Sequence, residues 1–238
     1  MVETSARFEE LRIPLPDPVH GLRHVSAVLG TPRWWPTGAR VGVVLAHDEK
    51  GGYQDPLLVH LHQQLTERRC LCLRFNFPFA EARKRKPDPL LVLRRTLRAA
   101  VGGIARDPEI APAHLFLVGM GLGARAVADL TATRLRVDGL AFLGFPLHPP
   151  GRPEEAAAEQ LFRVVSPMLF VQAEGDPRCD LRALHRVLSR VGAPTALHLC
   201  RDVDPQLRAL KKTGRNDVEV REEVLGVVEA WIHKVAGG

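Results

Sequence analysis

The chain has 238 residues, of which 45% are hydrophobic, 25% are charged and 5% are aromatic. This length and apolar content suit one α/β domain with a sizeable core, and we expect a single domain over residues 1–238. The net charge of +6 is spread along the chain, so it predicts a solvated basic surface and does not indicate a nucleic-acid partner. The first ten residues are charged and have no apolar stretch, so we expect no signal peptide, and no apolar run is long enough to cross a membrane.

The four cysteines do not form a pattern that is typical of a metal site. They contain no C-x-x-C pair and show no Cys/His spacing typical of zinc. Cys70 and Cys72 are two residues apart in a predicted strand, so both side chains should face the same side as small core residues. Reduced thiols indicate a cytoplasmic protein, and we expect no metal and no cofactor.

The first 38 residues predict edge strands and a loop, and the core is expected over residues 39–238. Residues 8–15 alternate apolar and polar side chains and end in prolines, which is typical of an edge strand. Residues 25–29 predict a second short strand, and residues 33–36 predict a loop. Residues 39–46 form a continuous apolar run, which is typical of a strand covered on both faces in a parallel sheet.

Strands and helices then alternate to the end of the chain. The first helix is expected over residues 55–68, with Asp55 as its cap and Pro56 at the first helical position. A basic loop at residues 83–86 precedes an amphipathic helix over residues 89–105. The other expected strands cover residues 70–75, 115–118, 139–145, 168–173 and 195–200, and the other helices cover residues 122–130, 154–162, 180–190 and 216–235. This alternation predicts a doubly wound, mostly parallel α/β sheet with helices on both faces, in which ligands gather at the carboxyl ends of the strands.

A glycine-rich turn, G-M-G-L-G-A at residues 119–124, follows the central strand and opens a helix. Gly119, Gly121 and Ala124 fit the phosphate turn of dinucleotide-binding domains. The same turn fits the nucleophile elbow of α/β-hydrolases, G-x-S-x-G, except that Gly121 stands in place of the nucleophile. The nucleotide interpretation also needs an acidic residue at the end of the next strand. Asp138 lies before that strand, so we favour the elbow and keep nucleotide binding as a second alternative.

The order of the other segments supports the elbow. A nucleophile elbow follows a central strand, and the strand that ends at His47 would supply a second oxyanion donor. The catalytic acid should follow a later strand, and Asp176 does so in E-G-D-P. The catalytic histidine should follow the last strand, in the chain order Ser, Asp, His.

Several segments resemble one branch of the α/β-hydrolases. They are L-A-H at residues 45–47 with the glycines 51 and 52, R-F-N-F-P-F at 74–79, G-M-G-L-G-A-R at 119–125, F-P-L-H-P-P-G-R-P at 145–153, and L-F-V-Q-A-E-G-D-P at 169–177. On these segments the chain resembles the dienelactone-hydrolase-like α/β-hydrolases, in the branch of the NSL-complex hydrolase-like subunit, the testis-expressed hydrolase-like protein and their bacterial relatives. The resemblance implies an α/β-hydrolase fold with triad-equivalent positions at Gly121, Asp176 and Pro205.

Two of these three positions lack a catalytic side chain. The family has serine where Gly121 stands, and a D-H-S-like segment where this chain has D-P-Q with Pro205 in the middle. No histidine occurs from residue 201 to residue 232. Acyl transfer needs a nucleophile and an adjacent base, so we predict a non-catalytic homologue, a pseudohydrolase. The alternative is an active esterase in which Asp176 with His47 or His148 activates water.

The backbone of the turn can still present a donor to an anion. The N–H of Leu122 opens a helix, where the dipole favours negative charge, and Lys50 would add positive charge nearby. We therefore predict an oxyanion-like pocket for a small anionic or acyl ligand, or else a binding function toward a protein partner. Around this pocket we expect His47, Asp48, Lys50, Leu122 and His148, with both histidines in structural roles. Asp48 and Lys50 replace small residues of the family, and a cleft filled by either side chain or by the loop at residues 201–207 would indicate a structural remnant.

Overall fold

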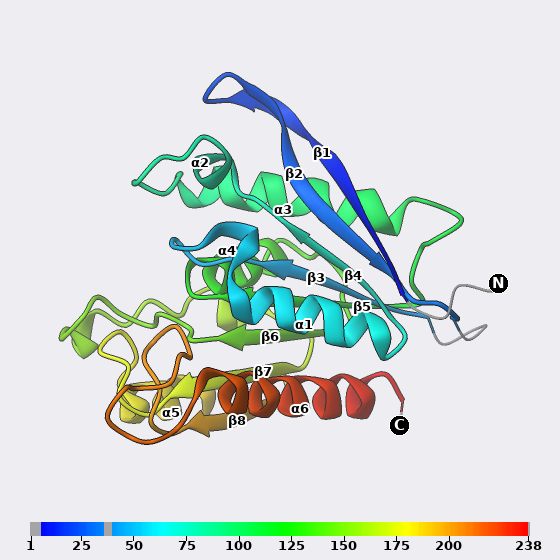
Figure 1. Ribbon diagram of the computed structural model, residues 1–238. Coiled ribbons are helices and arrows are strands. Elements are labelled where there is room, and N and C mark those ends of the chain that lie inside the picture. The colour runs from blue at the N-terminus through cyan, green and yellow to red at the C-terminus, as the bar shows by residue number, and fades with distance from the viewer. Residues whose placement is uncertain (1–5, 36–39, 238) are drawn as a thin grey trace.

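The computed structural model describes residues 6–35 and 40–237, which form an eight-stranded sheet covered by helices (Figure 1). The strand order is β1-β2-β4-β3-β5-β6-β7-β8. β1 (Arg7–Val19) and β2 (Leu22–Thr31) form an antiparallel hairpin, and β2 also pairs antiparallel with β4 (Cys70–Phe75). All other neighbours pair in parallel: β3 (Val41–Ala46), β5 (His114–Met120), β6 (Gly139–Leu143), β7 (Met168–Ala173) and β8 (Thr195–Cys200). The mostly parallel sheet expected from the sequence is confirmed.

Helices cover both faces of this sheet. α1 (Pro56–Glu67) and α6 (Asp217–Val235) pack beside each other on the face toward the viewer in Figure 1. α3 (Leu90–Ala105), α4 (Leu122–Thr131) and α5 (Leu181–Leu188) pack on the opposite face. Each face therefore has its own buried apolar cluster, and the continuous apolar strands contribute side chains to both clusters.

Capping side chains define where three of the helices begin. Asp55 accepts a hydrogen bond from the N–H of Leu57 at the start of α1, with Pro56 at the first helical position. Asp180 accepts from Ala183 at the start of α5. At the start of α6, Asn216 accepts from the N–H groups of residues 218 and 219. These starts agree with the helices expected from the sequence.

The N-terminal hairpin is longer than the expected strands at residues 8–15 and 25–29. Prolines at positions 14, 16 and 18 do not end β1, because β1 is an edge strand and needs no ladder donor on its outer side. The chain reverses at His20 and Gly21, which both have positive φ, at 53° and 78°. The expected loop end at Pro36 and strand start at Ala39 lie outside the described residues.

Two local expectations differ from the structure. The helix expected over residues 154–162 is wrong: two short 3-10 turns, η2 (Pro153–Glu155) and η3 (Leu161–Arg163), stand at the ends of this stretch. The N–H of Ala157 donates instead to the carbonyl of Leu147, at 2.9 Å, so a tertiary contact replaces the helical bond. A four-residue helix, α2 (Pro78–Glu81), follows β4 just before the basic loop, where no helix was expected. Among the helices of residues 6–35 and 40–237, none combines the length and the apolar character needed to span a bilayer.

Candidate functional site

The glycine turn joins the end of β5 to the start of α4, at the carboxyl edge of the sheet. Gly121 has φ 52° and ψ −113°, a conformation that residues with a Cβ rarely adopt. The glycines on either side allow close packing. A Cβ at Gly119 would lie 2.6 Å from the backbone nitrogen of Ala124, and one at Gly123 would lie 2.3 Å from the carbonyl oxygen of Ala46. The three glycines thus build a sharp strand–turn–helix elbow.

The carboxylate of Asp48 fills the space above this elbow. Its Oδ1 accepts a hydrogen bond from the N–H of Leu122, at 2.7 Å, and the residue is 2% exposed. A Cβ placed on Gly121 would lie only 2.1 Å from the same oxygen. Asp48 therefore occupies both the oxyanion donor and the place of a nucleophile side chain. The positive end of the α4 dipole favours the negative charge at this position.

His47 holds the loop that carries Asp48. Its Nε2 accepts from the N–H of Phe77, at 2.9 Å, and its Nδ1 therefore donates to the carbonyl oxygen of Asp48. The ring packs against the rings of Phe77 and Phe79, with centroids 4.9 and 5.6 Å away. Burial lowers the pKa of His47 to about 4, so the imidazole is neutral near pH 7. Both ring nitrogens are engaged, which fits the structural role expected for this residue.

Asp176, the acid of the triad-equivalent set, is paired with an arginine. Its Oδ1 accepts from the backbone N–H of Arg178 at 2.8 Å and lies 3.4 Å from Nε of the same residue. Its Oδ2 accepts from the side-chain amide of Gln172 at 2.9 Å. Arg178 also donates to the carbonyl oxygen of Pro205, at 3.5 Å. A guanidinium thus links the acid to the loop in which the family has its histidine.

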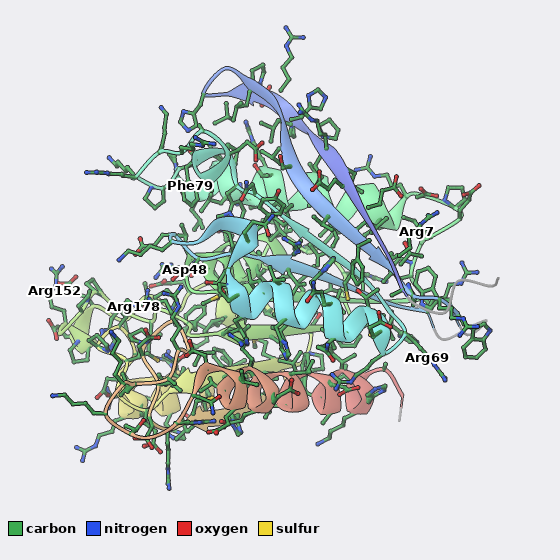
Figure 2. All side chains as sticks on the ribbon, in the orientation of Figure 1. Arg7, Asp48, Arg69, Phe79, Arg152 and Arg178 are labelled. Carbon is green, nitrogen blue, oxygen red and sulfur yellow. The ribbon has the colours of Figure 1, made fainter. Side chains whose placement is uncertain are left out.

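Arg178 is a site residue that the sequence reasoning missed. It directly follows the E-G-D-P segment, and a cation two residues after a buried carboxylate is the signal that would have indicated the pair. Figure 2 shows Arg178 and Asp48 at the same end of the molecule. Pro205 also lies at this end, because a Cβ on Gly144, just after β6, would be 2.6 Å from the carbonyl oxygen of Pro205.

Two residues expected around the pocket, His148 and Lys50, are not part of the group that Asp48 and Leu122 form. His148 is 4% exposed; its Nε2 accepts from the N–H of Asp180 at 2.7 Å, and its Nδ1 donates to the carbonyl of Pro149 at 2.8 Å. It therefore fixes the start of α5 through backbone contacts. Lys50 is exposed at the surface of its loop, whereas the neighbouring Asp48 is buried. The structure brings together His47, Asp48, Gly121 and Leu122 as one group, and Asp176, Arg178 and Pro205 as another.

The nucleotide alternative lacks its ribose partner. Asp138 accepts from the backbone N–H of Leu115 at 2.7 Å and lies 3.1 Å from Nδ1 of His114. These residues are at the start of β5, so Asp138 lies at the edge of the sheet opposite to the glycine turn. The N–H of Leu122, which would bind a phosphate, already donates to Asp48.

A model of the family described as alpha/beta hydrolase domain matches residues 39–233. The chain belongs to this family. The α/β-hydrolase match covers every element from β3 through most of α6, including the elbow and the segments that carry Asp176 and Pro205.

Solved structures share the α/β-hydrolase fold over almost the whole chain. A dienelactone hydrolase from Anabaena variabilis has a TM-score of 0.74 at 15% identity, covering 97% of this chain and 98% of that chain. An α/β serine hydrolase without a lid from Xanthomonas campestris has a TM-score of 0.70 at 18% identity, with 96% of each chain covered. A serine hydrolase homologue from Coxiella burnetii has a TM-score of 0.71 at 18% identity, covering 92% of this chain and 97% of that chain. At these identities the likeness shows the fold alone.

Proposed function

We propose that this chain is a non-catalytic α/β-hydrolase homologue with a degenerate triad. The observation that carries the proposal is the position of Asp48, whose carboxylate accepts from the N–H of Leu122 and fills the space above Gly121. In an active hydrolase this N–H stabilises the negative oxygen of the intermediate. A fixed carboxylate on that donor repels such an oxygen, and it leaves no room for a nucleophile side chain.

The histidine and acid positions support the same proposal. A general base needs a free nitrogen or oxygen facing the proton that it removes. Both ring nitrogens of His47 and of His148 are already bonded to backbone groups. Asp176 is held by Arg178 and Gln172, and neither can pass on a proton as a histidine does. These contacts argue against the alternative of an esterase that activates water through Asp176.

The finer placement of the chain rests on its motifs. We propose that it belongs to the branch of the NSL-complex hydrolase-like subunit, on the segments at residues 74–79, 145–153 and 169–177. A cytoplasmic location fits the four free, buried cysteines. Comparing these three segments with hydrolases of each branch tests the assignment. A better match to another branch would overturn it.

Ester hydrolysis tests the non-catalytic proposal directly. We expect the purified protein to hydrolyse p-nitrophenyl acetate and butyrate no faster than buffer does. Turnover that disappears in the Asp176→Asn variant would overturn the proposal.

Restoring the missing triad residues tests whether Asp48 blocks the site or whether the site only lacks its catalytic side chains. Gly121→Ser with Pro205→His should stay inactive, because Asp48 still occupies the oxyanion donor. Adding Asp48→Ala should produce weak esterase activity, and Arg178→Ala should increase it by freeing Asp176. Activity in the first pair of substitutions would show that Asp48 does not block the site.

The groove between β1 and α3 offers a different place for the expected ligand. It has a volume of about 1240 Å³, and its apolar floor includes Leu11, Ile13 and Ile104. Six arginines and four acidic residues line it, so its lining has an arginine surplus of two: Arg7, Arg12, Arg94, Arg95, Arg98 and Arg106 against Glu9, Asp17, Asp107 and Glu109. In residues 6–35 and 40–237, no carboxylate lies within ion-pair distance of Arg12, Arg98 or Arg106. We propose that an acyl chain with an anionic head binds in this groove, because Asp48 already takes the anion site at the elbow.

Displacement of a fluorescent fatty acid tests this binding function. We expect a long-chain carboxylate to displace the probe, and its methyl ester to compete at least about tenfold less well because it lacks the charge that arginines pair with. The double variant Arg98→Gln/Arg106→Gln should remove this preference. Equal competition by acid and ester, or an unchanged preference in the variant, would exclude the groove as the acyl site and leave a protein partner as the remaining binding function.

A further inference from the structure

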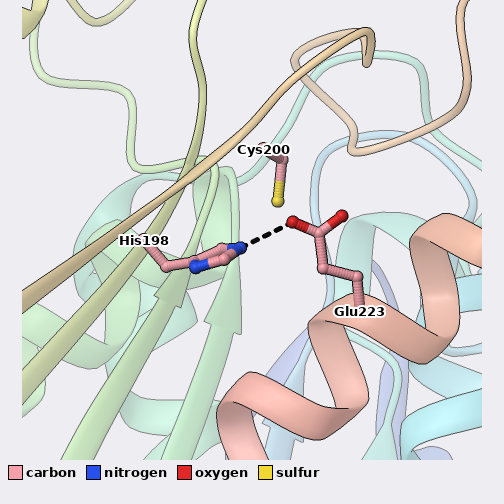
Figure 3. A group of neighbouring side chains, drawn as sticks. All are labelled: His198, Cys200 and Glu223. Carbon is pink, nitrogen blue, oxygen red and sulfur yellow. Dashed lines mark hydrogen bonds and ion pairs between the residues drawn. The ribbon is translucent and has the colours of Figure 1, made fainter.

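Three potential metal ligands meet between β8 and α6, away from the elbow. Figure 3 shows the imidazole of His198 and the thiol of Cys200, both on β8, directed at the carboxylate of Glu223 on α6. His198 Nε2 lies 2.6 Å from Glu223 Oε1, and one ligand atom from each residue lies within 4.8 Å of the other two. The spacing His-x-Cys places both strand side chains on the same face of β8.

We propose that His198, Cys200 and Glu223 form a Zn²⁺ site. Imidazole nitrogen, thiolate sulfur and carboxylate oxygen are the three ligand types that zinc accepts. In a tetrahedral site, nitrogen and oxygen ligands are about 3.4 Å apart and sulfur lies about 3.6 Å from either. The pair His198–Glu223 must therefore open by less than about 1 Å, and the thiol must approach within the present 4.8 Å.

The charges around the three ligands suit a divalent cation. On metal binding the thiol loses its proton to solvent, so one thiolate and one carboxylate neutralise the two charges of zinc. Arg215 is a nearby cation and pairs with the other oxygen of Glu223, Oε2, so the oxygen that faces His198, Oε1, is the one available to the metal. Arg215 also donates to the carbonyl of Arg201 at 2.7 Å, which anchors it in place. Hydrogen bonds of this kind orient carboxylate ligands from the outer shell of a metal site.

Two of the three ligands are partly exposed, which gives a metal ion access to the group. Cys200 is fully buried, whereas the side chains of His198 and Glu223 are 33% and 26% exposed. A cation can therefore reach the group from solvent between β8 and α6. Three protein ligands leave the fourth position to water or to a side chain of a partner, as in zinc sites that keep an open position. The site lies at the start of the loop that contains Pro205, so zinc would tie this loop to α6.

Metal binding to the purified full chain tests the proposal. We expect one Zn²⁺ per chain in competition with a chromophoric chelator, and a thiolate-to-cobalt charge-transfer band when Co²⁺ is used as the probe. Cys200→Ser should remove this band. His198→Gln and Glu223→Gln should each weaken zinc binding by more than about 100-fold, beyond the range found for outer-shell partners.

Two matched variants keep the test specific. Cys179→Ser changes another buried cysteine, and His233→Gln changes an exposed histidine of α6; both should bind zinc like the parent protein. Because Cys200 is buried, His198→Gln at a partly exposed position provides an independent test if Cys200→Ser fails to fold. Failure of the parent protein to bind Zn²⁺, or binding that survives His198→Gln and Glu223→Gln, would overturn the assignment.

Discussion

At the elbow, the carboxylate of Asp48 and the missing side chain of Gly121 depend on each other, because a serine at 121 would need the space that Asp48 fills. Asp48 in turn satisfies the N–H of Leu122, a donor at a helix start that would otherwise lack a partner. The aspartate therefore stabilises the turn in which the family has a reaction centre. This coupling explains how a strained elbow can persist without chemistry.

A double-mutant cycle at these two positions measures the coupling. Gly121→Ser should lower the free energy of unfolding by about 2–5 kcal/mol, because it adds overpacking to backbone strain. In the Asp48→Ala background the same substitution should cost about 1–3 kcal/mol, since only the strain remains. Urea unfolding of the four proteins gives the coupling energy. Effects that add to within about 0.5 kcal/mol would show that the two side chains do not compete for space.

His47 makes stability depend on pH. Burial lowers its pKa in the folded chain to about 4, whereas an unfolded histidine titrates near 6.5. Between these values the unfolded state binds a proton that the folded state does not, so stability is full above about pH 6.5 and falls as the pH falls. From pH 7 to pH 5 this one group should cost roughly 2 kcal/mol.

The variant His47→Gln isolates this contribution. Its unfolding free energy should fall less steeply than that of the parent over the same range, while His62, whose pKa burial also lowers to about 4, continues to act in both proteins. Chemical denaturation at pH 5, 6 and 7 measures the difference. Parallel pH profiles for the two proteins would mean that His47 is not neutral when folded.

At the scale of the elements, the capping side chains of α1 and α6 differ in burial and in the number of partners that they hold. Asp55 is 1% exposed, accepts from Leu57 and pairs with Arg208 at 3.2 Å, whereas Asn216 is exposed and accepts only from backbone N–H groups of its own helix. Asp55→Ala should therefore cost about 2–3 kcal/mol and Asn216→Ala about 1 kcal/mol. Thermal unfolding compares them, and Arg208→Ala shows how much of the Asp55 effect comes from the ion pair alone. Equal decreases in stability for Asp55→Ala and Asn216→Ala would show that burial of the cap does not increase its contribution.

Local patterns predicted the elements well where one segment determines its own structure. The bounds of β4, β7 and β8 are those expected, the expected cap Asp55 begins α1, and the helix expected from residue 216 begins there. Contacts between distant segments were harder to predict. The sequence pointed to Asp48 as a site residue, but the bond between Asp48 and Leu122 joins residues 74 positions apart, and no local pattern shows that the carboxylate closes the elbow. The meeting of His198 with Glu223 likewise depends on how α6 packs on β8.

For the whole molecule, the central feature is that two apolar cores share one sheet. One cluster contains α3, α4 and α5, and the other contains α1 and α6, while alternating residues of the same strands point into each. A loss of packing on one face must therefore disturb strands that support the other face. This arrangement supports the proposal that the chain is a single cooperative domain.

Matched substitutions in the two cores test this proposal by calorimetry. Leu130 on α4 and Leu225 on α6 are 0% and 1% exposed and belong to different clusters. Each change to alanine should cost about 2–5 kcal/mol and lower Tm by roughly 5–15 °C in a chain of this size. If the sheet couples the cores, each variant shows one transition whose calorimetric and van't Hoff enthalpies agree. If either variant instead splits the transition in two, the faces unfold separately, and the elbow could then lose its support while the zinc ligands on the other face stayed in place.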